Sequence, residues 1–326
     1  MTALELVNRL PSLRALVVGD ICLDRWCTYD PRLADRSRET GLDRVAVVST
    51  QNTPGGGGAV ANNLAALGLA RVAVLGSIGC DGNGYELVQA LEERGIDTGA
   101  LLRDRAVTTF TYTKLINRRT GVEDLPRIDY VQADPLPDTL QQQLAQRLLD
   151  IHGGFDLLLV ADQSEISTGG VVTQPVRRTI EEIGSNYPDK VILGDSRMRC
   201  ELFRRVTMKI NRAEAEAACQ RAFAGLDYEQ LCRHLCARRL FITDGPNGIV
   251  VLDAGRKIFI PAGRIEHPVD TCGAGDSFLA GAGCALALGA DAELSAQFGD
   301  LVASVTIMKP GTGTASPDEL RRILRA

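Results

Sequence analysis

Residues 270–276, DTCGAGD, combine the residue types best suited to chemistry on a phosphate. They precede SFLAGAGCALALGA, a run of small and apolar residues that predicts a helix. Gly273, Ala274 and Gly275 would then lie at the helix N-terminus, where unpaired N–H groups and the helix dipole bind an anion. Asp276, in the first turn, could take the proton of a hydroxyl group that attacks this anion. The alternative for Asp276 is a helix cap without a catalytic role.

A second cluster of glycines stands near the N-terminus. Four glycines, residues 55–58, follow Pro54 and precede AVANNLAALG, whose apolar spacing predicts a helix that ends at Gly68. The chain has no G-x-x-x-x-G-K-[ST] sequence, so these glycines do not form the phosphate loop of that motif.

The elements that must position these residues alternate between strands and helices. Short apolar runs predict strands at residues 15–19, 71–76, 157–161, 191–193 and 240–243, with helical stretches between them, such as residues 85–94. This alternation predicts an α/β fold with a mostly parallel sheet that helices cover on both faces. Two segments, at about residues 25–53 and 108–131, break the pattern and read as antiparallel strands that form a lid. Because no linker or repeat interrupts the chain, we expect a single domain over residues 1–326 with this lid.

Composition excludes several classes of partner. The chain has 36 Lys and Arg against 41 Asp and Glu, a net charge of -5, which argues against nucleic acid or a membrane surface as the main partner. It contains no run of roughly 18 to 20 apolar residues, and its first residues lack the apolar core of a signal peptide, so we expect a cytoplasmic protein. The nine cysteines are odd in number and scattered, which indicates reduced thiols.

With these residues in place, DTCGAGDSFLAG closely resembles the C-terminal signature of the ribokinase-like, or PfkB-type, carbohydrate kinases. Five further segments resemble that family in the same order: VVGDICLDR, PGGGGAVANNLAALG, GSIGCDGNG, KINRAEAE and ITDGPNG. The resemblance extends over nearly the whole chain. It implies a ribokinase-like three-layer fold and an enzyme that uses ATP and Mg²⁺ to phosphorylate a hydroxyl group of a sugar or sugar phosphate.

The resemblance also implies roles for individual residues. Asp276 would be the base, and the N–H groups of Gly273, Ala274 and Gly275 would hold the charge of the transferred phosphate. The nucleotide side would comprise Asn211, Glu214, Thr243, Gly245 and Gly248, with Glu214 acting on Mg²⁺ through water. The acceptor would contact Asp24, Gly55, Gly56, Gly57 and Asn63. A monovalent cation such as K⁺ would be held near Asp270, Thr271, Gly311 and Ser316.

For Asn211 and Glu214 the residues alone favour a different interpretation. Asn as a helix cap with Glu three residues later is the pattern of a helix N-terminus.

Within the family, TKLINRRTGVEDLPRIDY and MKPGTGTASPDEL resemble the branch that phosphorylates heptose phosphate. Two positions depart from it: Ala59 replaces an Asn that contacts sugar hydroxyls, and Glu165 replaces a Lys suited to a substrate phosphate. Arg197 and Arg199 could supply positive charge instead, or be structural. The alternatives are a kinase for a nucleoside or another non-sugar alcohol, and a sensor of the same fold that binds without catalysis.

The lid strands would expose unpaired edges, so we expect two lids to pair in a homodimer.

Overall fold

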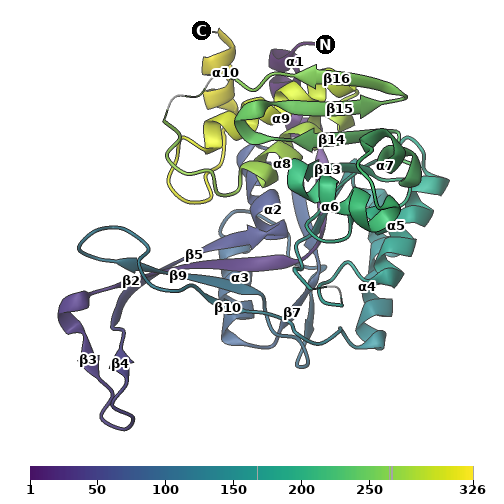
Figure 1. Cartoon of the computed structure of the whole chain (residues 1–326). Helices are drawn as coiled ribbons and strands as arrows, with labels where there is room; N and C mark the ends of the chain where they lie inside the picture. The colour runs from purple at the N-terminus through teal and green to yellow at the C-terminus, as the bar shows by residue number, and fades with distance from the viewer. Residues whose placement is uncertain (167, 264, 266, 326) are drawn as a thin grey trace.

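The central sheet has eight strands in the part of the chain that the computed structural model describes, which is residues 1–326 except 167, 264, 266 and 326. Six neighbouring strands run parallel, and two antiparallel strands extend the sheet at one edge (Figure 1). In spatial order they are β6 (Arg71–Leu75), β1 (Arg14–Gly19), β11 (Leu157–Asp162), β12 (Val191–Ser196), β13 (Thr207–Asn211), β14 (Arg239–Thr243), β15 (Ile249–Asp253) and β16 (Arg256–Ile260). The expected α/β fold with a mostly parallel sheet is confirmed.

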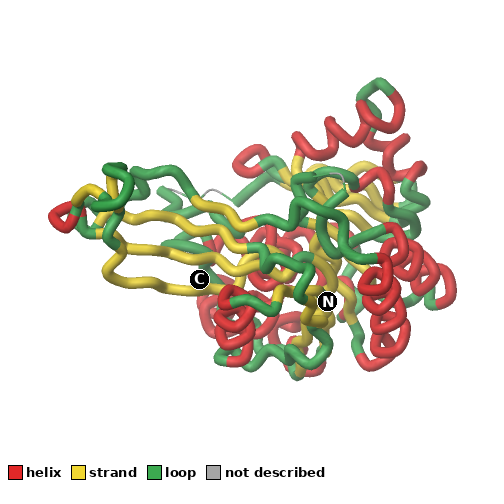
Figure 2. Tube along the Cα trace, turned by 90° about the horizontal axis from the view of Figure 1, so that it is seen from below, coloured by secondary structure: helices red, strands yellow, loops and turns green. Residues whose placement is uncertain are grey.

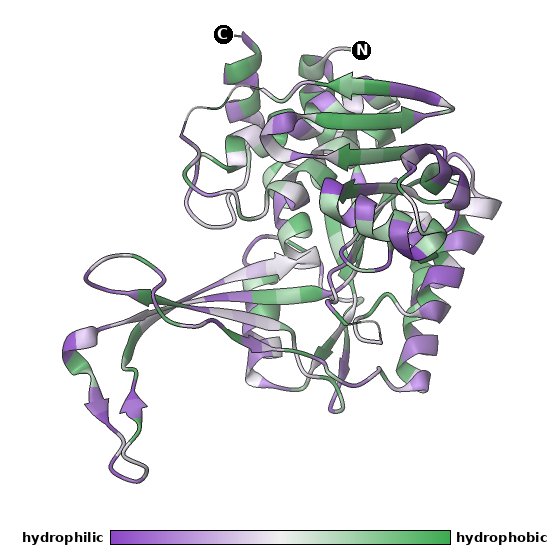
Figure 3. Ribbon diagram, in the orientation of Figure 1, coloured by the Kyte–Doolittle hydropathy of each residue, from purple (hydrophilic) through white to green (hydrophobic). Residues whose placement is uncertain are grey.

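Helices cover both faces of this sheet, because its strands present apolar side chains to both sides. In β1, Ala15 and Val17 pack on one side and Leu16 and Val18 on the other. The first side holds α1 (Ala3–Arg9), α2 (Gly57–Ala66), α3 (Gly82–Glu92), α8 (Ala274–Ala287), α9 (Ala292–Thr306) and α10 (Pro317–Arg325). The second side holds α4 (Asp138–Ile151), α5 (Gln174–Asn186), α6 (Arg212–Phe223) and α7 (Tyr228–His234). Figure 3 shows the contrast between the hydrophobic strands of this sheet and the mixed polarity of the lid.

A separate four-stranded sheet forms the lid and extends away from the helical layers (Figure 2). Its order is β10 (Ile128–Tyr130), β9 (Thr111–Asn117), β2 (Ile21–Tyr29) and β5 (Val47–Gly56). A small hairpin, β3 (Asp35–Arg36) and β4 (Asp43–Arg44), projects from its outer end (Figure 1). A further short pair, β7 (Ser77–Gly79) and β8 (Leu102–Asp104), lies where the chain returns from α3 to the lid.

The expectation of antiparallel lid strands is correct for β5 and β10 but wrong for β9. β5 runs antiparallel to β2 and β10 antiparallel to β9, whereas β9 runs parallel to β2. The reason is the connection: between β2 and β9 the chain passes through α2, β6 and α3, so both strands enter the lid from the same end. The lid also begins earlier than residue 25, because β2 starts at Ile21, immediately after β1.

All nine cysteines are free, as the odd and scattered set predicted. Among the residues described, no helix has the length and apolar character needed to cross a membrane.

Candidate active site

The N-terminus of α8 lies where the sequence predicts it. Gly273 precedes the helix with a φ of 77°, a left-handed conformation that favours glycine, and a Cβ there would lie 2.5 Å from the Thr312 side chain. Of the three N–H groups expected to be unpaired, that of Ala274 is not: it donates to the Thr271 carbonyl at 3.2 Å. No described residue accepts a hydrogen bond from the N–H of Gly273 or Gly275. These two groups are therefore the donors left for an anion.

Asp276 occupies the first turn of α8 without capping it. Among the described residues no side chain caps this helix, so the structure does not show the capping interpretation of Asp276. The pKa of Asp276 is raised to about 7, chiefly by burial and then by the charge of Asp195, while Lys209 and Arg197 oppose the rise. A carboxyl group with a pKa near neutrality is well matched to proton transfer.

A cavity of about 140 Å³ brings Asp276 together with Asp24. Asp24 projects from β2, and its carboxylate packs so closely on Gly55 that a Cβ there would lie 2.3 Å from Oδ1. The Thr312 hydroxyl donates to Asp24 at 3.5 Å. The lining comprises Asp24, Arg25, Trp26, Gly56, Tyr112, Lys114, Arg127, Arg197, Cys272, Gly273, Asp276 and Thr312.

The lid contributes two cation–aromatic pairs to this cavity. The strand period of two and the parallel register place Asp24 beside Tyr112 and Trp26 beside Lys114 on one face of the lid sheet. The Lys114 ammonium lies 4.4 Å from the centre of a Trp26 ring, and the Arg127 guanidinium 5.1 Å from that of Tyr112. This face of the lid, which we call the acceptor face, is therefore aromatic and positively charged.

The opposite face of the lid is anchored to the body of the protein. Arg25 pairs with Glu86 of α3 and donates to Asn83 at 2.8 Å, and the Asn52 side chain donates to Glu86 at 3.0 Å. These contacts join β2 and β5 to the first turns of α3 and hold the acceptor face over the cavity.

Three residues expected to contact the acceptor have other contacts. Gly55 lies outside the cavity lining and packs against the Asp24 carboxylate. Gly57 lies outside the cavity lining and approaches Ile21, where a Cβ would come within 2.8 Å of the side chain. Asn63 is buried in α2; its amide donates to the Ala59 carbonyl at 3.0 Å, and its oxygen accepts from the Ser277 hydroxyl at 3.1 Å. Asn63 thus links α2 to α8.

The predicted nucleotide residues meet at the carboxyl ends of β13 and β14. Asn211 and Thr243 are directly paired in the sheet register. Asn211 caps α6 by accepting from the Glu214 N–H at 2.9 Å, and the Glu214 carboxylate accepts from the Asn211 N–H at 2.8 Å. The helix N-terminus that this pattern predicts is confirmed. Gly245 and Gly248 follow with positive φ angles of 50° and 98°.

Residues 14–319 match the pfkB family of carbohydrate kinases. The chain belongs to this family. The bifunctional proteins HldE of Trichlorobacter lovleyi and Geobacter sulfurreducens are each 31% identical to it, over 97% and 95% of this chain and 64% and 62% of their own length. The chain thus spans less than two thirds of the length of these relatives.

Solved structures show the same fold. Escherichia coli phosphofructokinase-2 in complex with potassium superposes with a TM-score of 0.73 at 20% identity, covering 96% of this chain and 98% of that one. Arabidopsis thaliana ribokinase complexed with ribose and ATP gives 0.70 at 17% identity, covering 97% and 99%. The expected ribokinase-like fold and membership of the carbohydrate kinase family are confirmed.

The family implies a divalent cation. The predicted nucleotide residues fit a cation that is held largely by the phosphates of the nucleotide. No three His, Cys, Asp or Glu side chains among the described residues come together as a metal cage. Mg²⁺ at such sites is typically bound by one or two carboxylates, water and the phosphates of the nucleotide. Glu214 would hold it through water. Burial, then Asp195, raises the pKa of Glu214, so a nearby cation would favour its ionised form.

The four residues expected around a monovalent cation are only partly brought together. The Asp270 carboxylate accepts from the Gly311 N–H at 3.1 Å and from the Cys272 N–H at 2.9 Å. Thr271 offers its carbonyl to Ala274. The Ser316 hydroxyl instead donates to Glu319 at 2.8 Å, at the start of α10.

The sequence analysis missed a buried ion pair beneath α8. The ammonium of Lys209 lies 2.8 Å from Asp195 Oδ2, and both side chains are less than a tenth exposed. A Cβ on Gly275 would lie 2.7 Å from this nitrogen, so the positive charge abuts the turn at the N-terminus of α8. A lysine between Met208 and Ile210 in a short strand, TMKIN, was the available signal.

The two arginines that could supply positive charge have different surroundings. Arg199 is buried, pairs with Asp162 at 2.7 Å and donates to the Gly169 carbonyl, which is a structural role. Arg197 lines the kinase's cavity, and its guanidinium lies 2.7 Å from Glu165. Glu165 therefore neutralises an arginine of the site.

Proposed function

We propose that this kinase transfers the γ-phosphoryl group of ATP to a hydroxyl group of a sugar phosphate, of the heptose phosphate kind. The observation that carries the proposal is the acceptor face. Lys114 and Arg127 line the same cavity as Asp24 and Asp276, so an acceptor that places its hydroxyl between the two carboxyl groups can place its phosphate on the two cations. The resemblance of the segment that contains both cations to the heptose phosphate branch supports this acceptor, as does the similarity to the HldE proteins.

In this proposal Asp276 receives the proton of the acceptor hydroxyl. The hydroxyl oxygen bonds to the γ-phosphorus, the bond from that phosphorus to the bridging oxygen breaks, and ADP leaves with the bond electrons. Asp24 orients the acceptor, Gly55 leaves room for the Asp24 carboxylate to pack against it, and Gly56 lines the cavity. The turn at Gly273 to Gly275 stabilises the charge on the moving group.

The remaining nucleotide contacts would come from Asn211 and from the loop that begins at Thr243 and includes Gly245 and Gly248. Bound Mg²⁺ would neutralise phosphate charge, and Asp270 with Gly311 would take part in holding K⁺.

The test is ADP release from ATP with Mg²⁺ and K⁺ across sugars, sugar phosphates including heptose 7-phosphate, and nucleosides. We expect a sugar phosphate to stimulate release most. The variants Lys114→Gln and Arg127→Gln should each raise the acceptor KM by roughly 10- to 100-fold, because each removes a charged contact to phosphate.

The matched control is Arg119→Gln, which removes an exposed arginine of the lid outside the cavity and should leave the KM unchanged. A nucleoside as the best acceptor would contradict the proposal, and so would an acceptor KM that is insensitive to Lys114 and Arg127. Nucleotide binding without turnover of any acceptor would favour the sensor.

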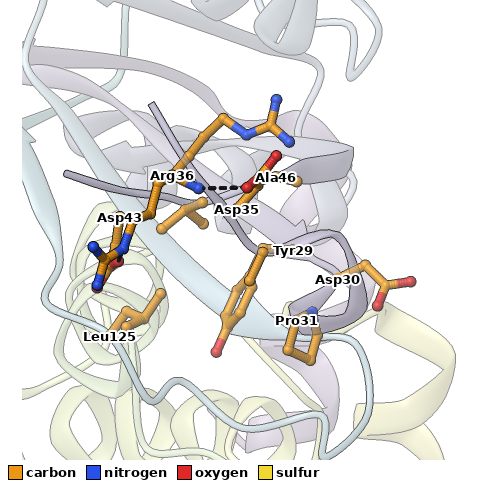
Figure 4. Close-up of a pocket in the computed structure, with 11 residues that line it drawn as sticks. Tyr29, Asp30, Pro31, Asp35, Arg36, Asp43, Ala46 and Leu125 are labelled. Atoms are coloured by element: carbon orange, nitrogen blue, oxygen red, sulfur yellow. Dashed lines mark hydrogen bonds and ion pairs between the residues drawn. The ribbon is translucent and has the colours of Figure 1, made fainter. Parts of the chain in front are cut away.

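We also propose that the kinase forms a homodimer through its lid. β5 is an edge strand of the lid sheet, and Val45, Val47 and Val48 in and beside it are each more than two fifths exposed. A cavity of about 440 Å³ adjoins this edge at the outer end of the lid, with Tyr29, Pro31 and Leu125 in its lining (Figure 4). An exposed apolar edge strand of this kind is normally covered by another chain.

Replacing Val47 with lysine should convert a dimer into a monomer, because the charge would be buried in the apolar contact. Sedimentation velocity at micromolar concentration measures the change. The control is Ile323→Lys, an exposed apolar residue of α10, which should remain dimeric. A wild-type protein that sediments as a monomer would contradict the proposed dimer.

A further inference from the structure

Arg197 lies where the acceptor cavity meets the predicted phosphate site. It follows β12 directly, at the carboxyl end of the central sheet, and its backbone N–H donates to the Asp162 carbonyl at 3.1 Å. Its side chain lines the cavity together with Asp24, Gly273 and Asp276. Two residues earlier, Asp195 holds Lys209 against the anion-binding turn. The backbone of this segment thus connects the cavity to the predicted phosphate site.

The charge of Arg197 acts on both sides of that site. Burial raises the pKa of Asp24, of Asp276 and of Glu214, and Arg197 opposes the rise in all three. Asp24 belongs to the acceptor side, Asp276 is the proposed base, and Glu214 belongs to the nucleotide side. The geometry agrees for two of these groups, because Arg197 lines the same cavity as Asp24 and Asp276.

The contact between Arg197 and Glu165 leaves the guanidinium available. A guanidinium has five N–H donors in a plane, and the hydrogen bond to Glu165 uses one nitrogen, Nη1. Both side chains are partly exposed, 41% for Arg197 and 64% for Glu165, so the pair can open at little cost. Phosphate oxygens carry more charge than one carboxylate and accept from a guanidinium in bidentate geometry.

We propose that Arg197 is a catalytic residue that donates hydrogen bonds to the γ-phosphoryl group during its transfer, and that Glu165 holds the guanidinium until nucleotide binds. This inference rests on the proposed kinase reaction and assigns the acceptor phosphate to Lys114 and Arg127 alone. Arg197 exchanges no proton. It stabilises the charge on the phosphoryl oxygens while the bond to the acceptor oxygen forms and the bond to ADP breaks.

The first test separates kcat from KM. Arg197→Ala should lower kcat by about 10³-fold or more, the range for an arginine that contacts a transferred phosphoryl group, and change the acceptor KM by only a few fold. Arg197→Lys should recover part of the loss, and guanidinium ion at millimolar concentration should partly rescue Arg197→Ala. Arg178→Ala removes an exposed arginine of α5 and is the matched control. A raised acceptor KM with kcat within about tenfold of wild type would overturn the proposal, because it identifies an acceptor ligand.

The second test needs no acceptor. ADP with Mg²⁺ and aluminium fluoride mimics the moving phosphoryl group, and the wild-type protein should bind ADP much more tightly when fluoride and aluminium are present. Arg197→Ala should lose about 10²-fold or more of this tightening and keep its affinity for ADP alone. Equal tightening in both proteins, or none in the wild type, would overturn the inference. If the wild type turns over no acceptor in the panel, the proposed function fails, and this comparison still decides the role of Arg197.

Discussion

Asp276→Asn is expected to abolish turnover while ATP still binds. The amide cannot accept the hydroxyl proton, and loss of a general base typically costs roughly 10² to 10⁴-fold in kcat. The matched control is Asp291→Asn. Asp291 is also a carboxylate at a helix N-terminus, where it accepts from the Leu294 N–H at 2.8 Å, and asparagine caps a helix equally well. Steady-state kinetics and nucleotide titration of the three proteins provide the comparison, and near wild-type turnover by Asp276→Asn would contradict the assignment.

The pH profile gives the same prediction an independent readout. The pKa of Asp276 is raised from 3.8 to about 7 by burial and by the charges of Asp195 and Asp24, against the opposing effect of Lys209 and Arg197. A base works only when ionised, so kcat/KM of the wild type should fall as the pH drops through about 7.

Asp276→Asn should lower activity but should not lower the stability of the fold. Because the pKa is raised on folding, the folded state binds the proton more tightly than the unfolded chain does, and ionisation above the unfolded pKa destabilises the fold. Asp276→Asn removes this charge. At pH 8 its melting temperature should therefore equal or exceed that of the wild type, and a lower value would indicate damage to the fold instead of loss of a base.

Lys209→Met is expected to damage both stability and catalysis. The side chain is 6% exposed, and methionine would leave Asp195 as an unpaired buried carboxylate, which typically costs about 3 to 5 kcal/mol in the free energy of unfolding. The ammonium also abuts Gly275 in the anion-binding turn. Its loss should lower kcat by about 10²-fold, as for one missing oxyanion contact.

The double variant Lys209→Met with Asp195→Asn separates the two effects. It removes the unpaired charge, so denaturant unfolding should show that much of the lost stability returns. Activity should stay low because the positive charge at the turn is still absent. Recovery of kcat together with stability would show that Lys209 acts only as a structural partner of Asp195.

Local pattern determined much of the fold and the centre of the site. The alternating strands and helices predicted the parallel sheet, and DTCGAGD followed by a small-residue helix placed Gly273 and Asp276 in the correct turn. Both predictions rest on features that involve only a few neighbouring residues: the hydrophobic period, the conformation of glycine and the residues at helix termini. Parallel strands then bring the ends of β13 and β14 to one edge, which is why Asn211 and Thr243 meet.

Tertiary structure alone decided the rest. The parallel pairing of β9 with β2 depends on a connection of some eighty residues, and only that pairing puts Lys114 over Trp26 and Arg127 near Asp24. The contact of Asn63 with Ser277, the ion pair of Lys209 with Asp195 and that of Arg197 with Glu165 likewise join residues from different elements. The period of two along a strand determines which face of the sheet a side chain occupies. The burial and the partner of that side chain are set by the elements packed against it, which are distant in sequence.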